Sequence, residues 1–150
     1  MNIGFSLFWG FIILLSTIGF SEVNFNLFKT CINKHCFDTR IADNPISRGR
    51  GLIGEEYLPK NEGMLFIFPV SSTPEFWMKN TKIHLDILFI NDNDTIVYAV
   101  KNAPPCLSNE KCPTYKPNHP VSRVLEINGG LSNELNIKVG DQVEYFIEDD

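Results

Sequence analysis

The feature that most constrains the fold is a series of short apolar segments separated by turn-forming residues. The strongest segment, 83–90 (IHLDILFI), is followed by four residues that favour turns (NDND) and by a returning segment at 95–100 (TIVYAV). This pattern predicts a β-hairpin. Further strands are expected at 26–32, 36–42, 64–69, 75–80, 122–127 and 142–147. Strands at such short, regular spacing predict a mainly β domain, built as a compact antiparallel sandwich or barrel-like fold.

One or two short helices are expected between the strands. Asn44 is suited to the N-cap of a helix, Pro45 to its first position, and Gly51 or Gly54 to its end. These residues predict a helix over 45–51. A single helical turn is expected at 132–135, after a glycine pair.

The chain has 150 residues, which is the length of one domain, and its net charge is −5. An acidic chain has no basic surface for phosphate backbones, which argues against binding to nucleic acid. It argues equally against electrostatic docking to anionic lipid. A long segment with five prolines, 101–120, is expected to be a loop.

The N-terminus carries an apolar segment, residues 3–20, with no charged side chain. A segment of this length is typical of a signal peptide or of a short membrane span. Gly19 and Ser21 fit cleavage after Ser21, whereas the absence of Lys or Arg before this segment leaves an uncleaved anchor open. Both interpretations place residues 22–150 outside the cytoplasm, as a periplasmic, secreted or membrane-anchored domain. The chain would contact a membrane only through 3–20, and only if that segment is retained.

Four cysteines form two local pairs, Cys31 with Cys36 and Cys106 with Cys112. An even number of cysteines behind an export segment predicts two disulfides, and proximity favours these two pairings. The alternative is a metal site that combines cysteines with His35, although zinc sites prefer two to four residues between paired cysteines. Neither a metal nor another cofactor is expected.

Several motifs then occur in the order of one known family. They are Gly51-Leu52, Glu62-Gly63-Met64-Leu65-Phe66, Phe76-Trp77-Met78-Lys79-Asn80-Thr81, Leu85-Asp86, Phe89-Ile90, Val124-Leu125-Glu126, Gly130 and Gly140-Asp141. The chain resembles the domain of unknown function 192 family over about residues 28–147. The resemblance implies a compact, mainly antiparallel β fold and frequent export or lipid anchoring, and it implies no activity. The chain departs from the family pattern at Ile53, where Met is usual, and at His84, where proline is usual. The loop that carries Cys106 and Cys112 looks like an elaboration.

The residues most suggestive of a site are Trp77, Lys79, Asn80, Asp86 and Glu126. If the strands align, Asp86 and Glu126 share one cleft. Two carboxyl groups beside an aromatic platform suit sugar binding, or glycoside cleavage with one acid and one base or nucleophile.

Structural roles are the alternative for the same residues. Asp86 is then expected to accept hydrogen bonds from the backbone or from Lys79, and Glu126 to pair with Arg123 or Lys101. Trp77 and Met78 are adjacent strand positions that face opposite sides, so at least one of them is expected in the core.

Motifs for nucleophilic or metal-assisted catalysis are missing, since the sequence contains neither G-x-S-x-G nor H-E-x-x-H. The leading hypothesis is therefore a non-catalytic extracytoplasmic binding or accessory domain. One alternative is a hydrolase of cell-envelope or extracellular carbohydrate that uses Asp86 and Glu126. Another is an envelope assembly module that binds a protein through 101–120.

Overall fold

The structure, a computed structural model, describes residues 28–107 and 111–147. The segment predicted to be a signal peptide or anchor lies outside these residues. Within them, no helix combines the length and apolar character needed to cross a membrane.

The described chain contains nine strands and two short helices, so the expected mainly β fold is confirmed. In chain order they are β1 (Phe28–Ile32), β2 (His35–Ala42), α1 (Pro45–Arg50), β3 (Glu62–Ser72), β4 (Phe76–Trp77), β5 (Leu85–Ile90), β6 (Ile96–Ala103), β7 (Thr114–Tyr115), β8 (Val121–Asn128), α2 (Leu131–Glu134) and β9 (Val143–Ile147). The expected strand at 75–80 is only two residues long. The expected loop at 101–120 is also shorter, because β6 continues to Ala103 and β7 lies within the loop.

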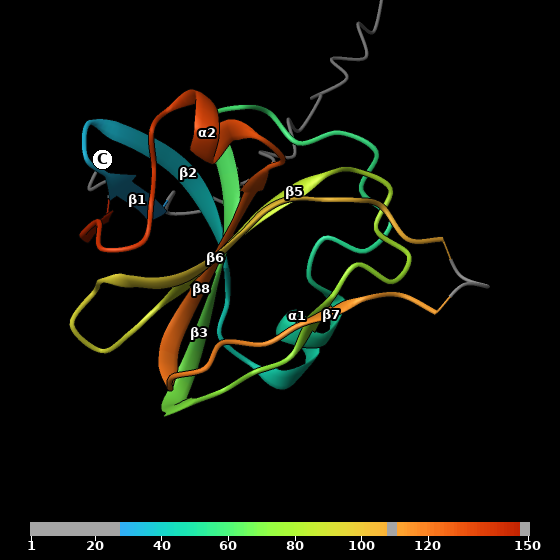
Figure 1. Cartoon of the computed structure of the whole chain (residues 1–150), viewed down its shortest axis with the longest axis horizontal. Helices are drawn as coiled ribbons and strands as arrows, with labels where there is room; N and C mark the ends of the chain where they lie inside the picture. The colour runs from blue at the N-terminus through green and yellow to red at the C-terminus, as the bar shows by residue number, and fades with distance from the viewer. Residues whose placement is uncertain (1–27, 108–110, 148–150) are drawn as a thin grey trace, which may run out of the picture.

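Seven strands form one mixed sheet in the order β6-β5-β8-β3-β2-β1-β9, and β4 pairs with β7 in a second, small sheet (Figure 1). The expected, mainly antiparallel arrangement is confirmed; the one exception among these strands is the parallel pair of β2 with β3. The reason is the connection between them: residues 43–61 include α1 and return the chain to the end of the sheet from which β2 started. A parallel pair needs a long crossover of this kind.

The large sheet curls but does not close into a barrel. Its two edge strands, β6 and β9, approach at one end, where Thr95 bridges to Gln142 and the backbone N–H of Val143 donates to the carbonyl of Asp94 at 2.8 Å. Ile96 on β6 and Val143 on β9 belong to the same buried cluster. The sheet therefore has an inner face inside the curl and an outer face opposite.

Strand β5 is buried along its whole length because both faces of the sheet are covered. Leu88 and Ile90 pack on the inner face, and Ile87 and Phe89 pack on the outer face. This alternation follows from the two-residue repeat of a strand.

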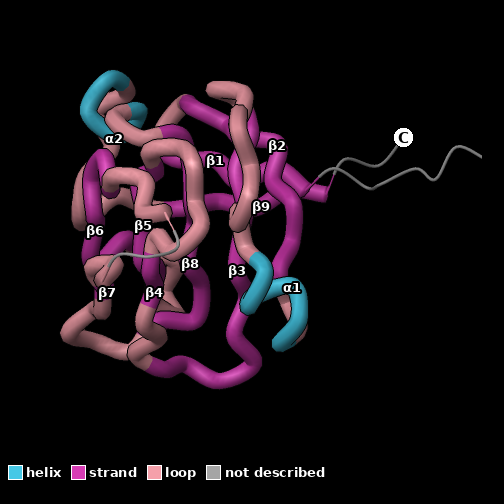
Figure 2. The backbone as a smooth tube through the Cα atoms, turned by 90° about the vertical axis from the view of Figure 1, so that its right-hand side faces the viewer, coloured by secondary structure: helices cyan, strands magenta, loops and turns pink. Residues whose placement is uncertain are grey.

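The segments that cover the two faces come from different parts of the chain. Leu131 and Ile137, from α2 and the chain after it, pack on the inner face. Leu52, Leu58 and Met78, from the segments after α1 and β4, pack on the outer face. Figures 1 and 2 show α1 and α2 at opposite ends of the molecule.

Helix α1 forms as its sequence predicts. The side chain of Asn44 accepts from the backbone N–H of Ile46 and Ser47, and Ser47 completes a capping box. Gly51 ends the helix at a positive φ of 47°, where its Cα also approaches the ring of Phe66: a Cβ there would lie 3.3 Å from that ring.

Both predicted disulfides are present. Cys31 and Cys36 are cross-strand partners that join β1 to β2, and Cys106 is bonded to Cys112 in the segment between β6 and β7. Because all four sulfurs are in disulfides, the alternative metal site with His35 loses its cysteine ligands.

Candidate functional site

A pocket of about 360 Å³ opens on the outer face of the sheet, between α1, β3 and the chain around β4. Its lining residues are Arg48, Gly49, Arg50, Gly51, Leu52, Ile53, Phe66, Phe68, Pro74, Glu75, Phe76, Trp77, Thr81 and Glu126. This volume lies within the range of small-molecule sites.

The first half of the FWMKNT motif builds one wall of the pocket. Phe76 packs edge-on against Phe66 and Phe89, with ring centroids 5.0 and 5.6 Å apart, which fixes the segment to the sheet. Met78 is fully buried in the core, whereas Trp77 remains 53% exposed at the pocket. The expectation that at least one of Trp77 and Met78 lies in the core is confirmed.

The second half of the motif anchors that wall. The Nζ of Lys79 lies 5.2 Å from the ring centroid of Trp77. Asn80 has a positive φ of 58°, and its backbone N–H donates to the carbonyl of Cys106 at 2.8 Å. Lys79 and Asn80 therefore position the pocket wall without lining the pocket. Thr81 does line it; this residue is buried, and its hydroxyl has no hydrogen bond to another residue in the described chain.

Glu126 lies at the base of the pocket, on β8. Its backbone neighbours in the sheet are Met64 on β3 and Ile87 on β5, and its side chain is only 5% exposed. Across residues 28–107 and 111–147, its carboxyl group makes no hydrogen bond or ion pair. Burial raises the pKa of this carboxyl from 4.5 to about 8, because the surroundings disfavour the charged form. The carboxyl is therefore mostly neutral at pH 7.

The basic residues expected to pair with Glu126 have other partners. Arg123 contacts Asp94 at 2.7 Å, and Lys101 donates to the side-chain oxygen of Asn133 at 2.8 Å.

Asp86 lies on the other face of the sheet. It is fully buried, with Oδ1 accepting from the backbone N–H of Asn102 and Gly130 at 2.6 and 2.8 Å, and Oδ2 accepting from that of Ser132 at 2.6 Å. These bonds join the end of β6 and the start of α2 to β5. Hydrogen bonding to the backbone was expected, and the contact with Lys79 is not formed.

The structure does not bring Asp86 and Glu126 into one cleft. Asp86 is the sheet neighbour of Ile127, whose side chain is in the inner cluster, and Glu126 is the neighbour of Ile87, whose side chain is in the outer cluster. The two carboxyl groups therefore point to opposite faces, and the paired-carboxylate mechanism lacks the shared site it requires.

Charged groups gather at the mouth of the pocket. Arg48 donates to the carbonyl of Ile67 at 2.9 Å, and its guanidinium lies 5.3 Å from the ring centroid of Phe68. Arg50 and Glu75 are exposed, and neither side chain has a hydrogen bond or ion pair within the described residues. With Glu126 neutral, the pocket has two guanidinium groups and one carboxylate.

Of the residues singled out in the sequence, Trp77 and Glu126 line the pocket. The sequence reasoning missed Arg48, Arg50 and Glu75. One signal was available, since the alternation of phenylalanines in 64–69 indicates a shared aromatic face. No local signal indicates that α1 packs beside that face.

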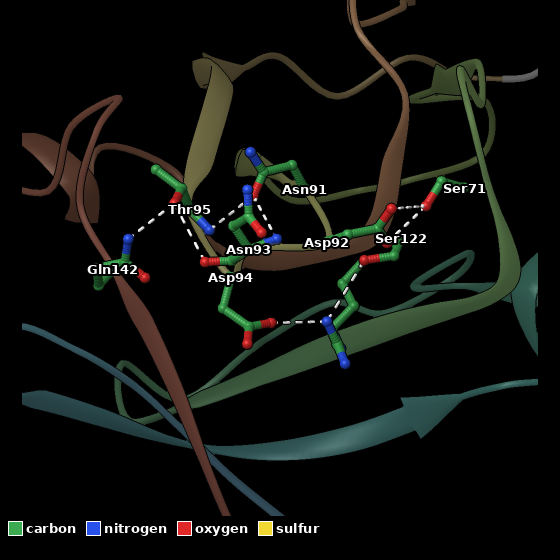
Figure 3. Close-up of polar contacts among 9 residues, drawn as sticks. Ser71, Asn91, Asp92, Asn93, Asp94, Thr95, Ser122 and Gln142 are labelled. Carbon is green, nitrogen blue, oxygen red and sulfur yellow. Dashed lines mark hydrogen bonds and ion pairs between the residues drawn. The ribbon is translucent and has the colours of Figure 1, made fainter.

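A second group of polar residues surrounds the turn between β5 and β6 (Figure 3). Asp92 accepts a hydrogen bond from Ser71 at 2.6 Å, which holds the pKa of this exposed carboxyl below its usual value. Asp94 contacts Arg123, and the side chain of Asn91 accepts from the backbone N–H of Thr95 at 3.0 Å. These groups satisfy one another, so the cluster stabilises the predicted turn rather than forming a site.

Comparison with known proteins agrees with this fold. The model of the DUF192 family, described as an uncharacterised ACR, matches residues 28–145. A crystal structure of a protein of unknown function from Novosphingobium aromaticivorans is similar, with 33% identity, a TM-score of 0.70, and coverage of 77% of this chain and 83% of that one. A putative transcription regulator from Sinorhizobium meliloti is also similar, with 31% identity, a TM-score of 0.70, and coverage of 79% and 93%. No curated protein matches the chain.

Proposed function

The chain belongs to the DUF192 family of uncharacterised proteins, and we propose that it is an extracytoplasmic, non-catalytic binding domain that takes a small ligand into the pocket over Glu126. The observation that carries this proposal is the carboxyl of Glu126, which is buried and has no partner among the described residues. A buried polar group without a hydrogen bond destabilises a fold. A ligand in the pocket supplies the missing partner.

The proposed location is supported by the two disulfides, which persist in oxidising compartments outside the cytoplasm. The apolar segment 3–20 supports export independently.

A role in transcription, suggested by the name of the Sinorhizobium meliloti protein, has less support for this chain. The net charge of −5 provides no general attraction for DNA, and the pocket is sized for a small molecule.

A ligand screen on the full chain with both disulfides oxidised tests the proposal. Ligands that fill the pocket are expected to raise the thermal midpoint of the wild type and to lose this effect in Trp77→Ala, which removes part of the pocket wall. Phe146→Ala is the matched control, because Phe146 is an aromatic residue on β9 that is 49% exposed and does not line the pocket. Midpoint shifts that are the same in both variants would refute the pocket as the binding site.

A further inference from the structure

This inference rests on the proposed function and specifies its ligand: we propose that the pocket binds an uncharged sugar ring, with Glu126 and Thr81 at the base and Trp77 at the mouth.

The base of the pocket presents two nearly buried residues whose side-chain oxygens face the pocket and are not used for hydrogen bonds within the described chain. Glu126 is 5% exposed and Thr81 is 4% exposed, and neither side chain forms a hydrogen bond with the rest of the described chain. A neutral carboxyl and a hydroxyl each donate one hydrogen bond and also accept. A sugar hydroxyl does the same, so it can satisfy both groups, whereas an ammonium only donates and a carboxylate only accepts.

The charges around the pocket disfavour a cationic ligand. Arg48 already places its guanidinium over Phe68, and Arg50 stands at the mouth, so a cation would meet two positive groups and only the carboxylate of Glu75. It would also have to induce ionisation of Glu126.

An anionic ligand is disfavoured at the base. Of the two arginines among the described lining residues, Arg50 is exposed, and the half-buried guanidinium of Arg48 already donates to the carbonyl of Ile67 and lies over the ring of Phe68. Neither is therefore positioned to neutralise a carboxylate at the buried end beside Glu126. An uncharged ligand avoids the desolvation cost of a charge at either end.

The walls and mouth suit the two kinds of surface on a sugar. Phe66, Phe76 and Trp77 offer apolar ring surface to its C–H face, and Trp77 is 53% exposed, so a ligand covers area that now contacts water. Arg50 donates and Glu75 accepts, and both are available to hydroxyls on the outer edge of the ring.

The role of Glu126 as a donor makes binding depend on pH. Its neighbours on β3 and β5, Met64 and Ile87, are uncharged, and the charged groups lining the pocket are Arg48, Arg50 and Glu75. The carboxyl loses its proton as the pH rises through about 8, its pKa in the folded protein. Affinity is then expected to fall by up to tenfold for each further pH unit.

Isothermal titration of the full oxidised chain with N-acetylglucosamine and methyl glucoside tests the inference, with benzylamine and benzoate as cationic and anionic probes. At pH 6.5 at least one sugar is expected to bind with the same heat in buffers of different ionisation enthalpy, because no proton is released. Thr81→Val, which keeps the shape of the side chain but removes its unpartnered hydroxyl, is expected to weaken binding about fivefold to tenfold without lowering the thermal midpoint of the unliganded protein.

Glu126→Gln keeps a donor and an acceptor, so it is expected to bind within about threefold of the wild type and to lose the pH dependence above 8. Glu134→Gln is the matched control, since Glu134 is exposed and pairs with Lys60. A chitin tetrasaccharide that binds at least tenfold more tightly than the monosaccharide would indicate a glycan polymer as the source; equal affinity would indicate a free sugar.

Binding of benzylamine with proton release, or of benzoate alone, would overturn the sugar assignment and leave the binding function standing. Sugar binding that Thr81→Val does not weaken would overturn the placement of the sugar against Thr81 at the bottom of the pocket. Failure of both sugars to bind, when the wider screen does find ligands dependent on Trp77, would overturn the ligand class alone. Failure of that screen as well would overturn the proposed function.

Discussion

Replacing Glu126 with Gln is expected to stabilise the domain at neutral pH and to remove a pH dependence of its folding. Burial raises the pKa of this carboxyl from 4.5 to about 8. Between pH 4.5 and pH 8 the folded protein therefore holds a proton on Glu126 that the unfolded chain has already released. The stabilising contribution of protonated Glu126 is complete below pH 4.5 and is lost as the pH rises to about 8. The loss is about 1.4 kcal/mol per pH unit, which amounts to roughly 3 kcal/mol at pH 7 and roughly 4–5 kcal/mol at pH 8.

Urea unfolding followed by circular dichroism from pH 4 to pH 9 measures this effect. Gln has the shape of protonated Glu and does not titrate. The difference in unfolding free energy between Glu126→Gln and the wild type is expected to be close to zero at pH 4.5 and to grow to roughly 3 kcal/mol at pH 7. Glu134→Gln changes an exposed carboxyl and is expected to follow the wild type. A Glu126→Gln difference that stays constant between pH 4.5 and pH 8 would refute the burial of an ionisable, unpartnered carboxyl.

Three further substitutions test the framework around the site. Asp86→Asn keeps the size of the side chain but loses one of the two oxygens that accept from three backbone N–H groups. Urea unfolding is expected to show an unfolding free energy lower by about 2–4 kcal/mol. A decrease below about 1 kcal/mol would contradict these hydrogen bonds. Gly129→Ala would place a Cβ 2.5 Å from the Cβ of His84. The same measurement is expected to show an unfolding free energy lower by about 3 kcal/mol, and an unchanged value would exclude this close packing. Replacing Cys106 and Cys112 together by Ser is expected to lower the unfolding free energy by about 2 kcal/mol and with it the thermal midpoint; an unchanged midpoint would show that this bridge does not constrain the unfolded chain.

The parts of the fold that depend on neighbouring residues were predictable from the sequence. The turn between β5 and β6 and the start of α1 follow from side chains that bond to the backbone two to four residues away, as Asn91 and Asn44 do. The parallel pairing of β2 with β3 was not predictable in this way. It depends on which strands become neighbours after residues 43–61 cross over, and no local pattern specifies that choice.

The extent of the strand expected at 75–80 failed for a related reason. Phe76 and Trp77 are extended, but Asn80 adopts a positive φ and its backbone N–H bonds to the carbonyl of Cys106. Both partners of that bond are in irregular segments far apart in the sequence. The strand propensity of the aromatic residues is therefore overridden by a tertiary contact.

The candidate site shows how sensitive such reasoning is to register. Trp77 and Glu126 were both identified and both line the pocket. Asp86 and Glu126 were expected together, yet Asp86 is aligned with Ile127, the residue directly after Glu126. Because side chains alternate along a strand, this offset of one position places the two carboxyl groups on opposite faces.

The contrast between these two buried acids is the strongest argument that the pocket binds something. Asp86 is surrounded by three backbone N–H donors, the arrangement expected of a carboxylate that holds a fold together. Glu126 is almost as deeply buried, has no such donor, and faces a pocket instead. An apolar side chain of similar size would pack at this position without the cost of a buried polar group. Where a residue breaks a local rule of stability without a compensating contact inside the protein, the compensating contact is expected from a ligand.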